Sequence, residues 1–184
     1  MIRLRLEPIP LDRADSFVGV TGFAEEEIPL RGQAGRLDWL LEGEGSRLIL
    51  DKRLNGAHRS QALLSSKRRV LPRYILFAGL GKRKSLTGTR LSNRVEDIVR
   101  GMLKASVQDM AMNVFAANGG KTNYEAEAAE TLNGALRALA GHPVDVSLAI
   151  CEPDPKRFEE LVLVSERTVF RPLEGRDIAL EIDI

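Results

Sequence analysis

Residues 73–85 read RYILFAGLGKRKS, in which an apolar run ends in Gly-Leu-Gly and basic residues follow at once. The apolar residues from Tyr74 to Ala78 stand between Pro72 and Gly79, and this length suits a strand that is buried on both faces of a sheet. In an α/β sheet, ligands collect in the loops beyond the carboxyl ends of the strands. The stretch therefore predicts a central strand, followed by a loop that is suited to a ligand.

Two hydrophobic periods alternate along the rest of the chain. A period of two, or a short apolar run, predicts further strands at 2–6, 16–20, 47–50, 110–115 and 144–150. A period of 3.6 predicts longer helices at 91–103, 128–139 and 155–165, and a short helix at 36–42. Because strands alternate with helices through the second half, the order favours a layered α/β domain with a largely parallel sheet there.

Local signals mark the ends of one helix and of the chain. Thr122 with Glu125 matches a capping box at the start of the 128–139 helix, and Gly141 is expected to stop that helix. Apolar and polar residues alternate over 176–184. This last segment is therefore expected to be an edge strand, or a tail that pairs with another chain.

The composition excludes several classes of protein. With 184 residues, 43% apolar and 29% charged, the chain has the composition of a globular domain with a real core. Its only cysteine, Cys151, rules out an internal disulfide framework and a multi-cysteine zinc site. No signal-like apolar region opens the chain, and no stretch approaches the ~20 apolar residues that span a bilayer. We therefore expect a cytoplasmic location and no membrane partner.

Charge is distributed unevenly along the chain. Between Lys52 and Arg94 there are 12 basic residues and no acidic one, although the net charge of the whole chain is only +1. Such a segment indicates an anionic partner, unless acidic helices neutralise it in the fold. If nucleic acid is that partner, backbone phosphates would be contacted in a salt-sensitive way. Aromatic residues are scarce and Tyr74 is expected to be buried, so sequence-specific binding and single-strand stacking are not expected. The residues assigned to this role are Lys67, Arg68, Arg69, Arg83 and Lys84.

Two loops predict a site for a small anionic ligand. The first contains Gly32 and Gly35, and the second contains Gly79 and Gly81. Glycine permits a positive φ and a close approach of the ligand, and successive N–H groups can form an anion nest. A helix N-terminus after the first loop would favour an anion as well. Neither the Walker A nor the Rossmann glycine spacing is present. The residues assigned to this ligand site are Gly32, Gly35, Gly79, Gly81 and Lys82.

The sequence contains no recognisable catalytic motif. His58 and His142 are far apart, and neither belongs to a motif with ligand spacing. Cys151 follows an apolar strand and is expected to be a core residue. Asp38 is a single carboxylate, for which a structural or capping role is expected. We predict no catalytic residue, no metal site and no cofactor.

Three stretches together resemble a known family. They are EEEIPLRGQAGRLDWLLEGEGSRL at 25–48, YILFAGLGK at 74–82 and HPVDVSLAICEPDPKRFEEL at 142–161. In this order they are similar to the N-terminal domain of leucyl (cytosol) aminopeptidases. The resemblance implies a single domain over 1–184 that is macro-domain-like, a three-layer α/β/α sandwich with a mixed, largely parallel sheet. Catalysis in that family resides in a second domain with two metal ions, so the resemblance implies that the catalytic metallopeptidase domain is absent here.

The resemblance leads to a non-catalytic interaction or regulatory domain as the expected function. Such a domain could associate with itself or with a full-length aminopeptidase. The alternatives are a phosphate-containing, nucleotide-like ligand at the glycine loops, and nonspecific nucleic-acid binding through residues 52–94. Macro domains that bind ADP-ribose usually carry an Asn-rich strand end and an acidic residue for the adenine. The corresponding strand here, 17–22, has no Asn, which argues against an ADP-ribose pocket.

Overall fold

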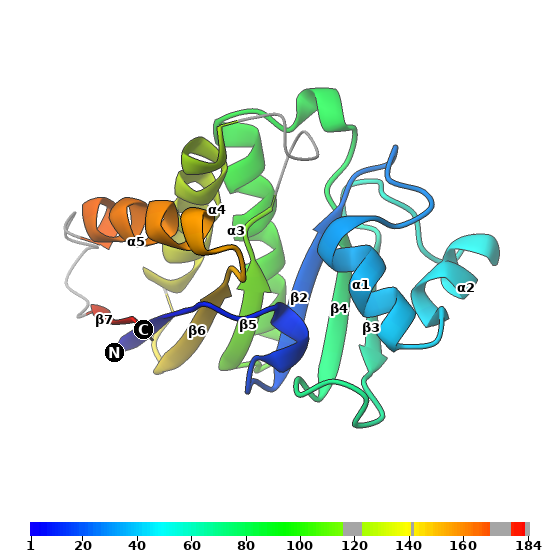
Figure 1. Ribbon diagram of the computed structural model, residues 1–184, viewed down its shortest axis with the longest axis horizontal. Helices are drawn as coiled ribbons and strands as arrows, with labels where there is room; N and C mark the ends of the chain where they lie inside the picture. The colour runs from blue at the N-terminus through cyan, green and yellow to red at the C-terminus, as the bar shows by residue number, and fades with distance from the viewer. Residues whose placement is uncertain (116–122, 141, 170–177, 183–184) are drawn as a thin grey trace.

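A seven-stranded sheet runs through the middle of the part of the chain that the computed structural model describes, residues 1–115, 123–140, 142–169 and 178–182 (Figure 1). Every neighbouring pair of strands is parallel except β3 with β4, so the sheet is mixed and largely parallel, as predicted. The strands lie in the order β3 (Gln61–Ser65), β4 (Tyr74–Gly79), β2 (Val18–Phe23), β5 (Asp109–Asn113), β6 (Val146–Cys151), β1 (Ile2–Glu7) and β7 (Ile178–Ile182).

Helices cover both faces of this sheet, which confirms the three-layer α/β/α sandwich (Figure 1). One face packs against α1 (Gly32–Leu40) and α2 (Glu44–Leu50), together with the short 3-10 helix η1 (Leu11–Arg13). The other face packs against α3 (Thr89–Lys104), α4 (Tyr124–Ala140) and α5 (Pro155–Val169). A second 3-10 helix, η2 (Arg83–Ser85), lies between β4 and α3. Among the described helices, none is long and apolar enough to cross a membrane.

The central position of β4 explains its continuous apolar sequence. Leu76 and Ala78 pack into the core shared with α3, α4 and α5, whereas Ile75 and Phe77 pack into the core under α1. Side chains alternate between the faces of a strand, so a strand between two helical layers needs apolar residues at every position. The prediction of a strand buried on both faces is therefore confirmed.

One predicted strand is a helix, one helix begins earlier than predicted, and one strand was missed. Residues 47–50 are the end of helix α2, because Leu48 and Ile49 pack on the core while Leu50 points to solvent and is 81% exposed. A four-residue apolar run fits a strand as well as one turn of a helix. Helix α1 begins four residues before the predicted start at Arg36. Strand β3 was missed because it is an edge strand whose outward positions are exposed and partly polar.

The expected edge strand at the chain end is present over residues 178–182. Strand β7 pairs in parallel with β1 at the edge of the sheet, as expected of an edge strand. The proposed capping residue Thr122 and the proposed stop at Gly141 lie outside the described residues.

Candidate functional site

A cavity of about 460 Å3 opens at the carboxyl ends of β2, β5 and β6. The parallel arrangement brings these ends to one edge of the sheet, where ligands of α/β proteins collect. The first turns of α1, α4 and α5 complete the wall. We call this cavity the carboxyl-end pocket.

Polar atoms without a partner gather around the carboxyl-end pocket. Among the described residues, no hydrogen-bond partner is found for Thr21 Oγ1 or Asn113 Oδ1, and both side chains line the cavity. Thr21 is completely buried. A buried polar atom without a partner is destabilising and therefore rare in folded proteins. Two such atoms on one cavity indicate a surface that is suited to a polar ligand.

The start of α1 adds backbone donors to this surface. Arg31, the N-cap residue, has an extended backbone and makes no capping bond with its side chain, while Gly32 has a φ of +54°. The first N–H groups of a helix have no partner within the helix. Those of Gly32, Gln33 and Ala34 belong to residues that line the cavity. The positive end of the helix dipole favours an anion there.

Three arginines and three glutamates line the carboxyl-end pocket. Arg83 is committed to the fold, because its Nη2 lies 2.7 Å from Glu27 Oε1. Arg31 makes no ion pair with a described carboxylate, and the guanidinium of Arg157 stacks 5.4 Å from the centre of the Tyr124 ring. The other two carboxylates are those of Glu127 and Glu152, both nearly buried. Arginine donors and glutamate acceptors are thus present in the same cavity.

Two groups in the pocket wall, the Tyr124 hydroxyl and the Cys151 thiol, are held in their neutral forms. Burial, and next the neighbouring Glu152 carboxylate, raise the pKa of the Tyr124 hydroxyl, so that it stays a hydrogen-bond donor. Burial, followed by the charge of Glu7, raises the pKa of the Cys151 thiol. A neutral thiol is a poor nucleophile. Cys151 is therefore a core residue, as expected.

Matched substitutions at two buried threonines test whether the Thr21 hydroxyl lacks a partner. Thr131 is as buried as Thr21, but its Oγ1 accepts the N–H of Phe115 at 3.2 Å. Thr131→Val is expected to lower the free energy of unfolding by about 1–2 kcal/mol, because this N–H loses its acceptor. Thr21→Val should leave the free energy of unfolding unchanged or raise it, because no hydrogen bond is lost. Urea unfolding followed by circular dichroism measures both, and an equal loss in the two variants would contradict the assignment.

The predicted glycines divide between the pocket and the fold. Gly32 lines the cavity, but a Cβ on Gly35 would lie 2.7 Å from the carbonyl oxygen of Leu30, so Gly35 permits close packing. Gly79 and Gly81 lie against the backbone of the loop around Gly56. The N–H of Gly79 donates to Ser60 at 2.7 Å, and that of Gly81 to Gly56 at 2.7 Å. These N–H groups are used within the fold and do not form the expected anion nest.

Of the two residues that follow Gly81, only the second lines the carboxyl-end pocket. Lys82 is the N-cap of η2 and does not line the cavity, whereas the adjacent Arg83 does. Gly32 and Arg83 are the two predicted site residues that the structure brings together there.

The predicted nucleic-acid residues lie at two different ends of the sheet. Lys67, Arg68 and Arg69 belong to the loop between β3 and β4, beside the amino end of β4, whereas Arg83 and Lys84 belong to η2 beyond its carboxyl end. Acidic residues neutralise some of them. Lys67 pairs with Glu44, Arg69 Nη2 lies 2.8 Å from Glu42 Oε2, and Arg83 pairs with Glu27. The basic segment is therefore neutralised in part.

Asp38 has the structural role that the sequence predicted. Its Oδ1 accepts the N–H of Ser46 at 3.0 Å, and its Oδ2 accepts the hydroxyl of Ser46 at 2.5 Å. These bonds fix the first turn of α2, whose leading N–H groups need acceptors from outside the helix.

His58 is expected to make the free energy of unfolding decrease as the pH falls. Its Nε2 lies 3.0 Å from Asp97 Oδ2 and its Nδ1 lies 2.7 Å from Arg94 Nη1, an arrangement that suits a neutral imidazole. Burial, and next the Arg94 charge, hold the pKa of His58 below its usual 6.5. The unfolded chain therefore takes up a proton first as pH falls below 6.5, and the stabilisation by the neutral form is lost towards the lower folded pKa.

The free energy of unfolding is accordingly expected to fall between pH 7.5 and pH 5.5, and His58→Asn should reduce this fall. Urea unfolding at the two pH values measures it. Identical pH dependence in the wild type and the variant would mean that another group is responsible.

The residues that matter most in the pocket were not predicted from the sequence. Thr21 follows directly after the strand predicted at 16–20, and Asn113 lies inside the strand predicted at 110–115. A polar residue that ends an apolar strand, as Asn113 does, is a signal that could have identified it. Tyr124 and Arg157 reach the pocket only through the packing of α4 and α5, which no local pattern reveals.

Comparison with known sequences identifies the family. The sequence model described as "Cytosol aminopeptidase family, N-terminal domain" matches residues 18–139, which is more than half of the chain. The chain belongs to the cytosol aminopeptidase family. Among curated protein sequences, none matches the chain significantly.

Solved structures confirm the macro-domain-like fold of this aminopeptidase domain. A mutant of the Oceanobacillus iheyensis macrodomain superposes with a TM-score of 0.73 at 11% identity, covering 92% of this chain and 94% of that one. The Trypanosoma brucei macrodomain in complex with ADP gives 0.68 at 13% identity, over 88% and 67%. A mutant of tomato leucine aminopeptidase gives 0.64 at 14% identity, over 90% of this chain and 36% of that one. The chain thus spans about a third of the tomato enzyme.

The described residues contain no recognisable metal site. These residues contain no group of three or more His, Cys, Asp or Glu side chains that could hold a metal ion. No metal ligand is therefore assigned in the part of the chain that the structure describes.

Proposed function

We propose that this aminopeptidase N-terminal domain is a non-catalytic, regulatory domain that binds a phosphate-containing, nucleotide-like ligand in the carboxyl-end pocket. The observation that carries the proposal is the pair of partnerless polar atoms on one cavity, the buried hydroxyl of Thr21 and the side-chain oxygen of Asn113. A ligand that bonded to these atoms would remove an energetic penalty of the unbound protein.

The phosphate groups are assigned to the α1 side of the pocket. Arg31 offers a guanidinium that is not paired with a described carboxylate, and the N–H groups of Gly32 and Gln33 stand at the positive end of the helix. Arginine recognises phosphate with two parallel hydrogen bonds. Gly32 has no side chain to hinder the approach of a phosphate oxygen.

The sugar and base are assigned to the β5 and β6 side. Asn113 Oδ1 and the carboxylate of Glu152 are acceptors for hydroxyl or amino groups, and the neutral Tyr124 hydroxyl is a donor. Asn113 also supplies the amide that is lacking in β2, at the end of the neighbouring strand β5. The lack of an Asn in β2 therefore counts little against an ADP-ribose pocket.

Structural neighbours support this class of ligand. The Oceanobacillus iheyensis macrodomain has been solved with ADP and, as a mutant, with ADPR, and the Trypanosoma brucei macrodomain in complex with ADP. At 11–13% identity these likenesses concern the fold, and the ligand is transferred here only as a proposal.

A thermal-shift series tests the proposed function. The melting temperature is measured with ADP-ribose, ADP, AMP and inorganic phosphate at low and moderate salt, for the wild type and for Thr21→Val. We expect a salt-tolerant rise with ADP or ADP-ribose that Thr21→Val reduces by half or more. The proposal fails if no nucleotide raises the melting temperature, or if the rise is the same in the variant.

The non-catalytic part of the proposal has its own test. The purified chain, supplied with zinc, manganese or magnesium ions, is expected to release no leucine from a leucyl p-nitroanilide above the rate of a metal-only control. Cys151 and Tyr124, the pocket groups that would need to ionise to act as nucleophiles, are both held neutral. Metal-dependent release that co-elutes with the protein in gel filtration would refute this part.

A further inference from the structure

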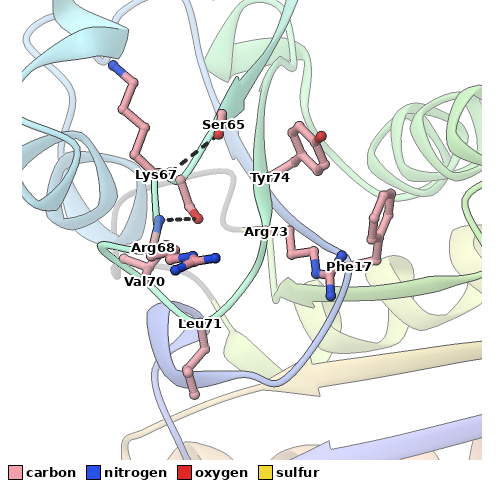
Figure 2. Close-up of a pocket in the computed structure, with 9 residues that line it drawn as sticks. Phe17, Ser65, Lys67, Arg68, Val70, Leu71, Arg73 and Tyr74 are labelled. Atoms are coloured by element: carbon pink, nitrogen blue, oxygen red, sulfur yellow. Dashed lines mark hydrogen bonds between the residues drawn. The ribbon is translucent and has the colours of Figure 1, made fainter.

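A second cavity lies at the opposite end of the sheet, beside the amino ends of β2 and β4 (Figure 2). It has a volume of about 610 Å3 and is lined by the β3–β4 loop together with Phe17. Its lining contains Lys67, Arg68 and Arg73 and no acidic residue, unlike the carboxyl-end pocket, which contains three glutamates. We call this cavity the amino-end pocket.

Two of the three cations are available to a ligand. Lys67 is bonded to Glu44, and Figure 2 shows its side chain extending away from Arg68. The guanidinium of Arg68 lies over the interior of the loop, on the side of Arg73 (Figure 2). Neither arginine makes an ion pair with a described carboxylate. Both arginines line the cavity, and Figure 2 shows the Arg73 side chain extending from just before β4 towards Phe17. A guanidinium group without an acidic partner is suited to a phosphate.

The turn that presents Arg68 is conformationally unfavourable. Lys67 and Arg68 have φ values of +51° and +63°, and the turn is closed by a bond of 2.9 Å from Arg69 N–H to the Ser66 carbonyl. Two-residue turns with positive φ at both central positions strongly favour Asn-Gly. Side chains that hold such a backbone cluster at functional sites. The sequence keeps two cations at positions where Asn and Gly would stabilise the turn.

An exposed aromatic ring stands beside these arginines. Phe17, the residue before β2, is 41% exposed, so its ring is accessible for stacking. Its ring centre lies 5.3 Å from that of Tyr74 at an interplanar angle of 59°. Single-stranded nucleic acid is bound by stacking bases on aromatic rings and by contacting phosphates with basic side chains. A concave site admits a base that is splayed out of a strand, whereas a duplex presents only its backbone and groove edges.

We propose that the amino-end pocket binds a nucleotide unit of a single-stranded nucleic acid, with the base on Phe17 and the phosphate between Arg68 and Arg73. The site is separate from the carboxyl-end pocket and does not depend on the function proposed for it.

Fluorescence anisotropy with a labelled 12-nucleotide oligo-dT tests this proposal. Arg68→Asn and Lys67→Asn form a matched pair, because the same residue enters adjacent positions that share a left-handed backbone. Arg68→Asn, Arg73→Gln and Phe17→Leu are each expected to weaken binding about fivefold or more, and Lys67→Asn less than about twofold. Each arginine variant should also reduce the slope of log affinity against log salt by about 0.7. Arg31→Gln, in the other pocket, should change nothing.

Three outcomes would overturn the proposal. Equal affinity of Arg68→Asn and Lys67→Asn would show that the pocket is not the contact. Displacement of the oligonucleotide by thymidine monophosphate at an equal nucleotide concentration would assign the site to a free nucleotide. Equally effective displacement by a glutamate-rich peptide of similar charge would assign it to an acidic protein segment.

Discussion

Replacing Gly134 by alanine is expected to lower the free energy of unfolding by about 3 kcal/mol, a large effect for a single added methyl group. A Cβ at this position would lie 2.2 Å from the carbonyl oxygen of Ser92 and 2.8 Å from Cβ of Val95. Both neighbours belong to α3, and neither a backbone carbonyl nor a Cβ atom can be moved by a change of side-chain rotamer. Helices α3 and α4 must separate to make room, which disrupts the core between them and the sheet (Figure 1).

Gly101 provides the matched control, since it also lies inside a helix. A Cβ there would have no neighbour within 4 Å. Gly101→Ala is therefore expected to raise the free energy of unfolding by about 0.5–1 kcal/mol, through helix propensity and the restricted unfolded chain. Urea unfolding followed by circular dichroism measures both variants. If Gly134→Ala were as stable as Gly101→Ala, the close contact of α3 with α4 would be incorrect.

The second large effect concerns the ligand. Arg31→Glu is expected to weaken ADP or ADP-ribose binding about 100-fold, measured by isothermal titration calorimetry. The substitution removes a guanidinium from the phosphate side of the pocket and places a carboxylate there, and losing a charged partner in a binding site costs about 2–5 kcal/mol. Arg31 makes no ion pair with a described carboxylate, so the fold itself should not be affected.

Lys104→Glu controls for net charge. It changes the charge of the chain by the same amount, at the last residue of α3, which does not line the carboxyl-end pocket. Its affinity should stay within about twofold of the wild type, because exposed charges beyond a Debye length of ~8 Å are largely screened at physiological salt. An equal loss of affinity in both variants would mean that overall charge, and not Arg31, holds the ligand.

The fold was predictable wherever a local pattern agreed with the tertiary environment. The continuous apolar run of β4 and the one-sided apolar face of α3 reflect their burial directly, so both were identified. Strand β3 lies at an edge, and α2 has one short turn of apolar residues, so the patterns that describe buried elements do not apply to them.

The site was less predictable, because topology builds it from distant segments. Thr21, Gln33, Asn113 and Tyr124 come from four elements, and nothing in the local sequence relates them. Glycines are conspicuous in a sequence, but Gly79 has a packing role against the backbone of Gly56. A buried hydroxyl without a partner is conspicuous only in a structure.

A single NMR titration tests the central claim most directly. ADP is added to the 15N-labelled chain, and the amide shifts are followed residue by residue. We expect the largest changes at the strand ends and the first turn of α1, at Thr21, Gly22, Gly32, Gln33 and Asn113. Changes confined to the β3–β4 loop, or none at millimolar ADP, would contradict a nucleotide site at the carboxyl ends of the sheet.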